Sequence, residues 1–157
     1  MAMLSFDLRQ LQDGPVATEA TVPADHPLFE GLTLDLVAPV EVGGRLQGTA
    51  GDDVLWHGHL TARVAGECRR CLEPLVQLLD EAVEVVFSAN EELLEDPSVY
   101  PLAVSSSEVD LGQAVREELV LRVQPFPLCR PECAGLCLTC GADLNAGPCA
   151  CTAGTTN

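Results

Sequence analysis

Apolar and polar residues alternate along much of the N-terminal half of the chain, a pattern typical of strands with one buried face. Residues 34–46 predict a long half-buried strand, bent at Pro39 or at the Gly-Gly pair that follows. After turn residues at 51–53, residues 54–64 repeat the alternation and predict the second strand of a hairpin. A third strand is predicted over at least residues 82–88. Successive strands without helical crossovers predict an antiparallel meander, as a small barrel or a curved sheet.

The remaining segments complete an α+β fold. Short alternating stretches within residues 1–32 predict an edge strand and a loop, and the acidic, proline-containing residues 89–107 predict a flexible connector. Ser105-x-x-Glu108 matches a capping box, and Asp110 could itself cap a helix. A helix packed on the sheet is predicted near residues 110–123, from an apolar stripe formed by Leu111, Val115, Leu119 and Val123.

Composition narrows the environment and the partners. The 157 residues include 24 acidic residues against eight basic ones, all arginine, for a formal charge of −16. This balance argues against a broad nucleic-acid surface and favours a basic protein partner. No basic, apolar leader segment or long apolar run is visible, so we expect a cytoplasmic protein with no membrane contact. In a reducing compartment, cysteines are expected to bind metal rather than form disulfides.

Eight cysteines carry the strongest chemical signal. Two form a C-x2-C pair, and six follow in the tail, at Cys68, Cys71, Cys129, Cys133, Cys137, Cys140, Cys149 and Cys151. Four thiolates complete the tetrahedral shell of a structural Zn²⁺ ion, so the sequence predicts one or two structural zinc sites. Four-sulfur sites leave no coordination position open, so catalytic zinc is not expected.

Two pairings of the cysteines remain open. In the first, Cys137 and Cys140 share an ion with Cys149 and Cys151, while Cys129 and Cys133 join the C-x2-C pair. The alternative places the four cysteines from residue 129 to residue 140 in one site and the other four in the second. Gly141 favours a metal knuckle at Cys137-x-x-Cys140, because glycine readily adopts positive φ.

Under the first pairing, the tail binds the far end of the hairpin across 57 intervening residues. We therefore expect a β-rich core over residues 1–126 and a zinc-binding tail over residues 127–157 that docks on it.

Other candidate chemistry is weaker. Cys68-Arg-Arg-Cys71 could be a redox pair, but that chemistry usually has a βαβ setting and this pair follows a hairpin. His57 and His59 lie on the polar side of their strand, so we expect them to face solvent. The chain contains no P-loop, dinucleotide-binding or hydrolase motif, so no enzymatic activity and no small-molecule substrate are expected.

Charged side chains near the cysteines are candidates for binding. Zinc binding would gather several arginines, which could neutralise the thiolates or contact RNA phosphate or a partner; these are Arg69, Arg70, Arg122 and Arg130. The acidic connector carries Glu91, Glu92, Glu95 and Asp96, which are either a solvated loop or a contact for a basic ribosomal protein.

Taken together, these motifs resemble the YceD family, named for large ribosomal RNA subunit accumulation. The resemblance rests on Glu67-Cys-Arg-Arg-Cys-Leu-Glu-Pro74, Val109-Asp-Leu111, Val115-Arg-Glu-Glu-Leu119, Pro127-Leu-Cys129 and Gly135-Leu-Cys-Leu-Thr-Cys-Gly-Ala-Asp-Leu-Asn145. It implies a non-enzymatic bacterial factor, with plastid relatives, that acts in ribosome assembly or rRNA processing. The implied partners are a basic ribosomal protein or an assembly factor, with large-subunit rRNA as a further candidate. A zinc-ribbon regulatory module and a thiol redox or metal-handling protein are the rival interpretations.

Overall fold

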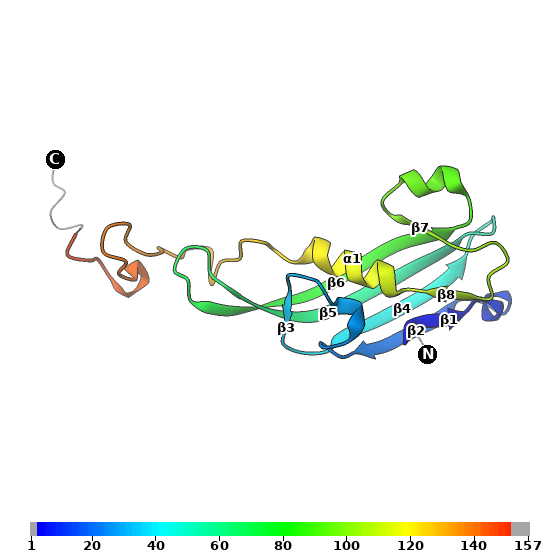
Figure 1. The fold of residues 1–157 in the computed structure, drawn as a ribbon, viewed down its shortest axis with the longest axis horizontal. Helices are drawn as coiled ribbons and strands as arrows, with labels where there is room; N and C mark the ends of the chain where they lie inside the picture. Colours follow the sequence, from blue (N-terminus) through cyan, green and yellow to red (C-terminus); the bar gives the residue numbers. More distant parts are fainter. Residues whose placement is uncertain (1–2, 152–157) are drawn as a thin grey trace. The chain divides into compact units, whose positions relative to one another are not determined.

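The computed structural model describes residues 3–151, which form two compact units (Figure 1). The first unit contains residues 3–64 and 78–123, and the second contains residues 65–77 and 124–151. Residues 65–77, which the sequence groups with the β-rich core, thus belong to the same unit as the cysteine-rich tail. The second unit is therefore built from two segments that are distant in sequence.

The main sheet has six strands in the order β2-β4-β5-β6-β7, with β3 paired to β5. The pairs β2 with β4 and β4 with β5 are antiparallel, whereas β6 and β7 are parallel. Strands β2 and β7 are its two edges, so the sheet is open rather than a closed barrel. Its strands are β2 (Val16–Val22), β3 (Asp35–Leu36), β4 (Val40–Gly48), β5 (Val54–Glu67), β6 (Pro74–Ser88) and β7 (Val99–Pro101).

Alternation along β5 produces the buried face of the sheet. Trp56, Leu60, Ala62 and Val64 are buried, as the sequence predicts. The Trp56 indole Nε1 donates a hydrogen bond of 3.0 Å to Thr18 Oγ1, which satisfies both polar groups in the core. The close fit around the indole restricts its neighbours, because a Cβ added at Gly58 would lie 2.4 Å from the Trp56 ring.

The structure corrects two predictions about the sheet and extends a third. The strand expected over residues 34–46 is interrupted before Pro39 and forms β3 and β4. The strand predicted over at least residues 82–88 is confirmed, and it begins earlier, at Pro74. The connector is not wholly a loop, since it contains a 3₁₀ helix η3 (Glu91–Glu95) and β7. Because β7 runs parallel to β6, the antiparallel meander ends at β6.

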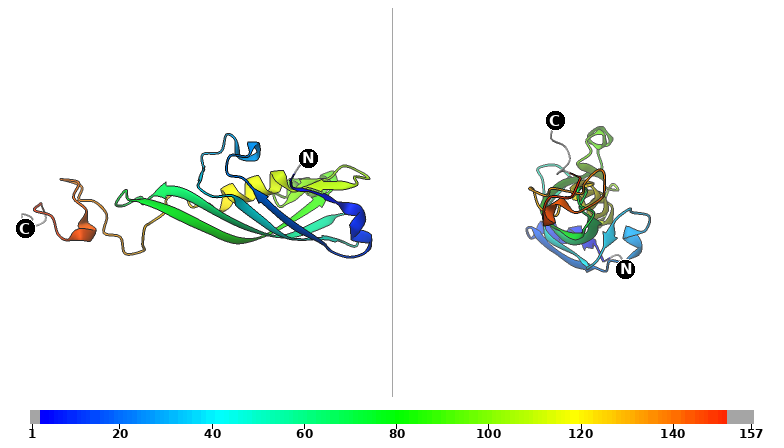
Figure 2. Two further views of the ribbon diagram at one scale, coloured as in Figure 1. Left: turned by 90° about the horizontal axis from the view of Figure 1, so that it is seen from below. Right: turned by 90° about the vertical axis from the view of Figure 1, so that its left-hand side faces the viewer.

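Helix α1 (Gly112–Arg122) lies along one face of the sheet in the first unit (Figures 1 and 2). Its predicted stripe is confirmed, because Leu111, Val115 and Leu119 are almost fully buried in the core of that unit. The predicted capping box is wrong, because Glu108 lies in strand β8 (Glu108–Asp110), which pairs with β1 (Ser5–Asp7). Asp110 instead accepts a hydrogen bond of 2.7 Å from the backbone N–H of Gly112.

Short 3₁₀ helices complete the described structure, at η1 (Leu8–Gln12), η2 (Pro27–Phe29) and η4 (Leu144–Ala146). Within residues 3–151, none of the helices has both the length and the apolar composition needed to cross a bilayer.

Candidate metal centres

The loop between β5 and β6 forms a tight turn around the first C-x2-C pair. The backbone N–H of Leu72 donates to the carbonyl of Cys68 at 2.9 Å, and the N–H of Cys68 donates to the carbonyl of Glu73 at 2.9 Å. Leu72 has a positive φ of 62°, which is uncommon for a residue with a branched side chain. The turn places the sulfur atoms of Cys68 and Cys71 on one side of the loop.

The second C-x2-C pair repeats this turn. The N–H of Gly141 donates to the carbonyl of Cys137 at 2.9 Å, and the N–H of Cys137 donates to the carbonyl of Ala142 at 2.8 Å. Gly141 has a φ of 73°, so it occupies the position of Leu72 in the first turn. The knuckle predicted from Gly141 is present, and the chain contains a second one that no glycine signals.

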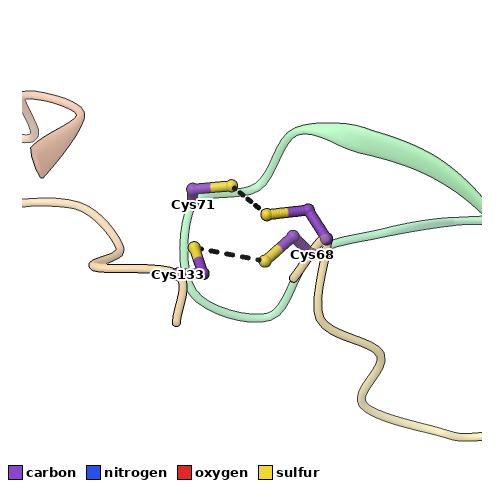
Figure 3. Close-up of side chains that lie close together, drawn as sticks. Cys68, Cys71 and Cys133 are labelled. Carbon is purple, nitrogen blue, oxygen red and sulfur yellow. Dashed lines mark hydrogen bonds between the residues drawn. The ribbon is translucent and has the colours of Figure 1, made fainter. Parts of the chain in front are cut away.

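The first group of sulfur atoms combines the two segments of the second unit. The sulfur atoms of Cys68, Cys71, Cys129 and Cys133 all lie within 4.8 Å of one another. Two of the separations, Cys68 to Cys133 and Cys71 to Cys129, are 3.7 Å. Figure 3 shows the sulfur atoms of Cys68, Cys71 and Cys133 turned toward one another.

The second group consists of the other four cysteines. The sulfur atoms of Cys137, Cys140, Cys149 and Cys151 also lie within 4.8 Å of one another. Both groups are those of the first pairing, and the structure does not form the alternative groups. The topology explains this choice, because the tail returns to the β5–β6 loop, where the N–H of Arg69 donates to the carbonyl of Pro127 at 2.9 Å.

The two groups differ in burial. Cys68, Cys71 and Cys133 are buried and pack with Leu75, Leu128 and Leu136 in a small apolar cluster, whereas Cys129 is exposed. In the second group Cys140 is exposed and the other three are half-buried. The neighbouring Leu138 side chain is fully exposed. The first group therefore lies in a packed environment, whereas the second is held mainly by its own loop.

The first group has the dimensions of a tetrahedral metal site, and the second is gathered within the same limit of 4.8 Å. Four sulfur atoms at about 2.3 Å from a central ion are separated by about 3.8 Å, close to the 3.7 Å found in the first group. A disulfide would require about 2.05 Å between sulfur atoms. Each group could therefore hold one metal ion in an all-sulfur shell.

The electrostatics of the first group suit a cation. Burial opposes ionisation of Cys68, but backbone N–H groups, including those of Cys129 and Cys71, lower its pKa to about 6. In contrast, desolvation of its sulfur and hydrogen bonds with neighbouring thiols raise the pKa of Cys129 to about 12. A bound cation would supply the charge that lets the resistant thiol ionise as well.

The second group shows the same division. Backbone N–H groups of Cys140 and Thr139 lower the pKa of Cys137 to about 6, and the Thr139 N–H lies 3.4 Å from its sulfur. A hydrogen bond with Cys140, together with burial, raises the pKa of Cys151 to about 11. In each group, therefore, the first cysteine of the knuckle has a lowered pKa and a cysteine outside the knuckle has a raised pKa.

The four candidate arginines do not form one group. In the second unit, Arg70 donates to the carbonyls of Cys133 and Pro131, at 3.0 and 3.4 Å, and Arg130 donates to Asn145 Oδ1 at 2.8 Å. Arg69 lies in the same unit and is exposed. Arg122 belongs to the first unit, where its Nη2 pairs with Glu118 at 3.0 Å. Two of the four arginines thus support the loops around the cysteines.

The strand histidines lie on the polar face of the sheet in the first unit. His57 Nδ1 lies 3.2 Å from a carboxylate oxygen of Glu84, and His59 contacts Asp80. Each histidine therefore faces a carboxylate of the neighbouring strand β6. Neither belongs to the two metal-compatible groups found among the described residues.

Two residues of the cysteine loops were not identified as functional from the sequence. Leu72 adopts the positive φ that the knuckle requires, but because the residue is not glycine, the sequence gives no sign of this conformation. Asn145 stands at the end of the quoted family motif, and its amide contacts the sulfur of Cys133 at 3.3 Å. Only its place in that motif could have drawn attention to it.

Comparison with known proteins identifies a family. Residues 56–157 match the sequence model of the family described as large ribosomal RNA subunit accumulation protein YceD. The matched region includes all eight cysteines and helix α1. No solved structure shows significant similarity to the chain.

Relatives extend the match toward the N-terminus. An uncharacterised protein of Mycobacterium leprae is 30% identical over 151 residues, which cover 91% of this chain and 68% of that protein. An uncharacterised protein of Mycobacterium bovis is 33% identical over 123 residues, which cover 76% of this chain and 55% of the relative. This chain thus spans about half the length of the Mycobacterium bovis relative.

A plant relative carries a descriptive name. A maize protein named large ribosomal RNA subunit accumulation protein YCED homolog 1, chloroplastic, is 39% identical over 51 residues. The match covers 32% of this chain and 17% of the maize protein.

Proposed function

Because the chain belongs to the YceD family of large ribosomal RNA subunit accumulation proteins, we propose that it is a non-enzymatic factor in assembly of the large ribosomal subunit. The match over residues 56–157 is the observation that carries this proposal, and the name of the maize relative agrees with it. We also propose a cytoplasmic location, because bacterial ribosomes are assembled there.

We further propose that each group of four cysteines binds a structural Zn²⁺ ion. Sulfur separations of 3.7 Å in the first group are too long for a disulfide and fit tetrahedral coordination, and all-thiolate ligand sets are typical of structural zinc. An ion in the first group would hold the tail against the β5–β6 loop within the second unit. Because all four positions of each shell are filled by sulfur, the ions would stabilise the fold rather than activate a substrate.

The distribution of charge supports an adaptor for a basic protein. The first unit contains 20 acidic residues and five arginines, a formal charge of −15, whereas the second contains four acidic residues and three arginines, a charge of −1. The first unit would repel RNA phosphate and attract a basic ribosomal protein or assembly factor. Any contact with rRNA would be made by the nearly neutral second unit, where Arg69 is exposed.

The first experiment is the rRNA profile of a deletion strain. We expect the mature large-subunit rRNA to decrease relative to the small-subunit rRNA, and the full chain supplied in trans to restore it. A normal ratio in the deletion strain would contradict the role in assembly.

Metal content and free-thiol titration of the purified protein separate the zinc proposal from the alternative of a redox protein. The redox alternative requires thiols that titrate readily.

The adaptor proposal has its own test, with the acidic 3₁₀ helix as the target. A Glu91→Gln, Glu92→Gln, Glu95→Gln variant should bind basic large-subunit ribosomal proteins more weakly at physiological salt, because three exposed carboxylates are lost. The matched control, Asp25→Asn, Glu30→Gln, Asp35→Asn, removes three exposed carboxylates elsewhere on the first unit. If the two variants weakened binding equally, the partner would be attracted by the overall negative charge of the first unit rather than by a contact at η3. Tight binding of purified protein to naked large-subunit rRNA at that salt would contradict the adaptor.

A further inference from the structure

Asn145 connects the two groups of cysteines. It lies in the eight-residue loop between Cys140 and Cys149, both ligands of the second group. Its side chain nevertheless reaches the first group, since Nδ2 lies 3.3 Å from the sulfur of Cys133. A residue carried by one candidate metal loop thus donates a hydrogen bond to a ligand of the other.

The orientation of the Asn145 amide is determined by its surroundings. Oδ1 accepts hydrogen bonds of 2.8 Å from Arg130 Nη2 and from the backbone N–H of Ala134. Nδ2 donates to Asp143 Oδ1 at 2.9 Å and to the Cys133 sulfur. A flipped amide would place its NH₂ against two donors and its oxygen against a carboxylate and a thiolate. The observed orientation therefore satisfies every polar atom of the side chain.

The linker between the groups is held on both sides. Three residues separate Cys133 from Cys137, and each uses a backbone group to contact a neighbouring loop. Besides the Ala134 contact, the carbonyl of Gly135 accepts from the N–H of Leu144 at 2.9 Å, and the N–H of Leu136 donates to the carbonyl of Arg70 at 3.1 Å. Arg70 lies between the two knuckle cysteines of the first group. The linker therefore contacts the loops of both groups at once.

Gly135 permits this close packing. Its φ of 78° is in the left-handed region, and an added Cβ would lie 3.1 Å from the Arg70 carbonyl oxygen. Both the conformation and the space thus favour glycine. The linker cannot shift at one group without disturbing its contact with the other.

We propose that Asn145 is a positioning residue that couples the two metal sites, so that an ion bound at either site strengthens binding at the other. This inference rests on the proposed zinc binding. An ion at the second site fixes the loop that carries Asn145, which then presents Nδ2 to the Cys133 thiolate. Partners of this kind typically change metal affinity by about 10- to 100-fold. Binding linkage requires the effect to be reciprocal.

The sharpest variant is Asn145→Asp. The carboxylate can still accept hydrogen bonds from Arg130 and Ala134, but an oxygen replaces the donor that faces Cys133. The matched control is Asn90→Asp, which makes the same chemical change at the N-terminus of η3 in the first unit. There the side-chain oxygen accepts from the N–H of Glu92, a contact that aspartate retains.

Release of zinc to a chromogenic chelator, measured on the full chain, gives the first readout. We expect Asn145→Asp to release the ion of the first site about 10- to 100-fold faster than the wild type. We expect Asn90→Asp to release it at the wild-type rate. Equal rates for the wild type and Asn145→Asp would overturn the role of Asn145.

A second pair of variants tests the coupling itself. Cys140→Ser, Cys149→Ser removes two ligands of the second site and leaves all four ligands of the first. Because this variant binds only one ion, its release kinetics identify the phase that belongs to the first site. We expect zinc to leave the first site faster than in the wild type, although all four of its ligands are present. Adding Asn145→Asp to this variant should accelerate release by less than it does in the wild type, because the loop is already unfixed. Full additivity, or an unchanged rate after loss of the second site, would overturn the coupling.

Substitution by Co²⁺ separates this inference from the zinc proposal. Tetrahedral thiolate sites give strong sulfur-to-cobalt absorption, which counts occupied sites without reference to biological activity. Wild-type protein that binds no ion would contradict the zinc proposal itself. Wild-type protein that binds two ions, with release rates unaffected by the variants, would contradict only the coupling.

Discussion

The two cysteine knuckles share one backbone turn but differ in what they join. Each has the same pair of hydrogen bonds and a residue with positive φ directly after its second cysteine. The first knuckle meets Cys129 and Cys133 across 57 intervening residues, and three of these four cysteines are buried. The second meets Cys149 and Cys151 across only eight residues, in a half-exposed loop. Identical local chemistry therefore serves a long-range contact in one case and a local one in the other.

Chain entropy gives this difference a magnitude. If each ion is treated as a cross-link, closing a loop of about 57 residues restricts the unfolded chain by about 4 kcal/mol, against about 2.5 kcal/mol for about eight residues. Burial adds to the contrast, because the first group also packs against Leu75, Leu128 and Leu136. Stability should therefore depend more on the first site than on the second.

The largest effect is expected from Cys71→Ser. Loss of a buried ligand should release the first zinc ion and free residues 124–133 from the β5–β6 loop. Metal analysis should fall from two ions to one per chain, and protease cleavage of the tail should accelerate by at least about tenfold. Retention of two ions would contradict the assignment of Cys71 to this site.

Cys140→Ser should have a smaller effect. It should also remove one ion, but it opens only the local loop, so the free energy of unfolding should fall by about 2 to 3 kcal/mol. Circular dichroism during urea unfolding, compared directly with Cys71→Ser, measures the difference. If Cys140→Ser were the more destabilising variant, the distinction between long-range and local sites would be wrong.

Gly141→Leu places in the second knuckle the residue type found in the first. Nothing lies within 4 Å of a Cβ added at Gly141, so the cost should be conformational alone. A non-glycine residue in the left-handed region costs about 1 to 2 kcal/mol, which should weaken zinc binding by about 5- to 30-fold. Chelator competition measures this change, and unaltered affinity would show that the turn relaxes without cost.

Leu72→Gly is the reciprocal change and should have the smallest effect. Relief of the positive φ should gain about 1 kcal/mol, but glycine increases the entropy of the unfolded chain by a similar amount. The Leu72 side chain is 56% exposed, so little packing is lost. Urea unfolding should place the variant within about 1 kcal/mol of the wild type. A loss above 2 kcal/mol, roughly the cost of a lost buried side chain, would show that the leucine itself has a structural role.

Sequence patterns were most informative where one physical signal dominates. Period-two alternation located the strands from β4 to β6, because one face of each must be buried. The C-x2-C spacing and Gly141 identified the second knuckle. The cysteine spacing offered two pairings and left the choice between them open, and the sulfur positions in the structure decide for the first.

Features that depend on tertiary contacts were missed. Strand β7 lies in a segment rich in acidic residues and proline, and its parallel pairing with β6 has no local signature. Ser105 and Glu108 have capping-box spacing, but Glu108 pairs with β1 instead. The conformation of Leu72 is imposed by the turn despite its side chain, and the contact of Asn145 with Cys133 depends on the placement of two loops.

The single tryptophan of the chain is buried in the first unit, where its indole bonds to Thr18. Its fluorescence emission therefore reports the solvent exposure of that unit's core, and it should shift to longer wavelength only when the core opens. The cysteine-rich unit contains no tryptophan and would be silent in this signal. Withdrawal of metal while emission is recorded would thus reveal directly whether the sheet survives loss of the cysteine-rich unit's structure.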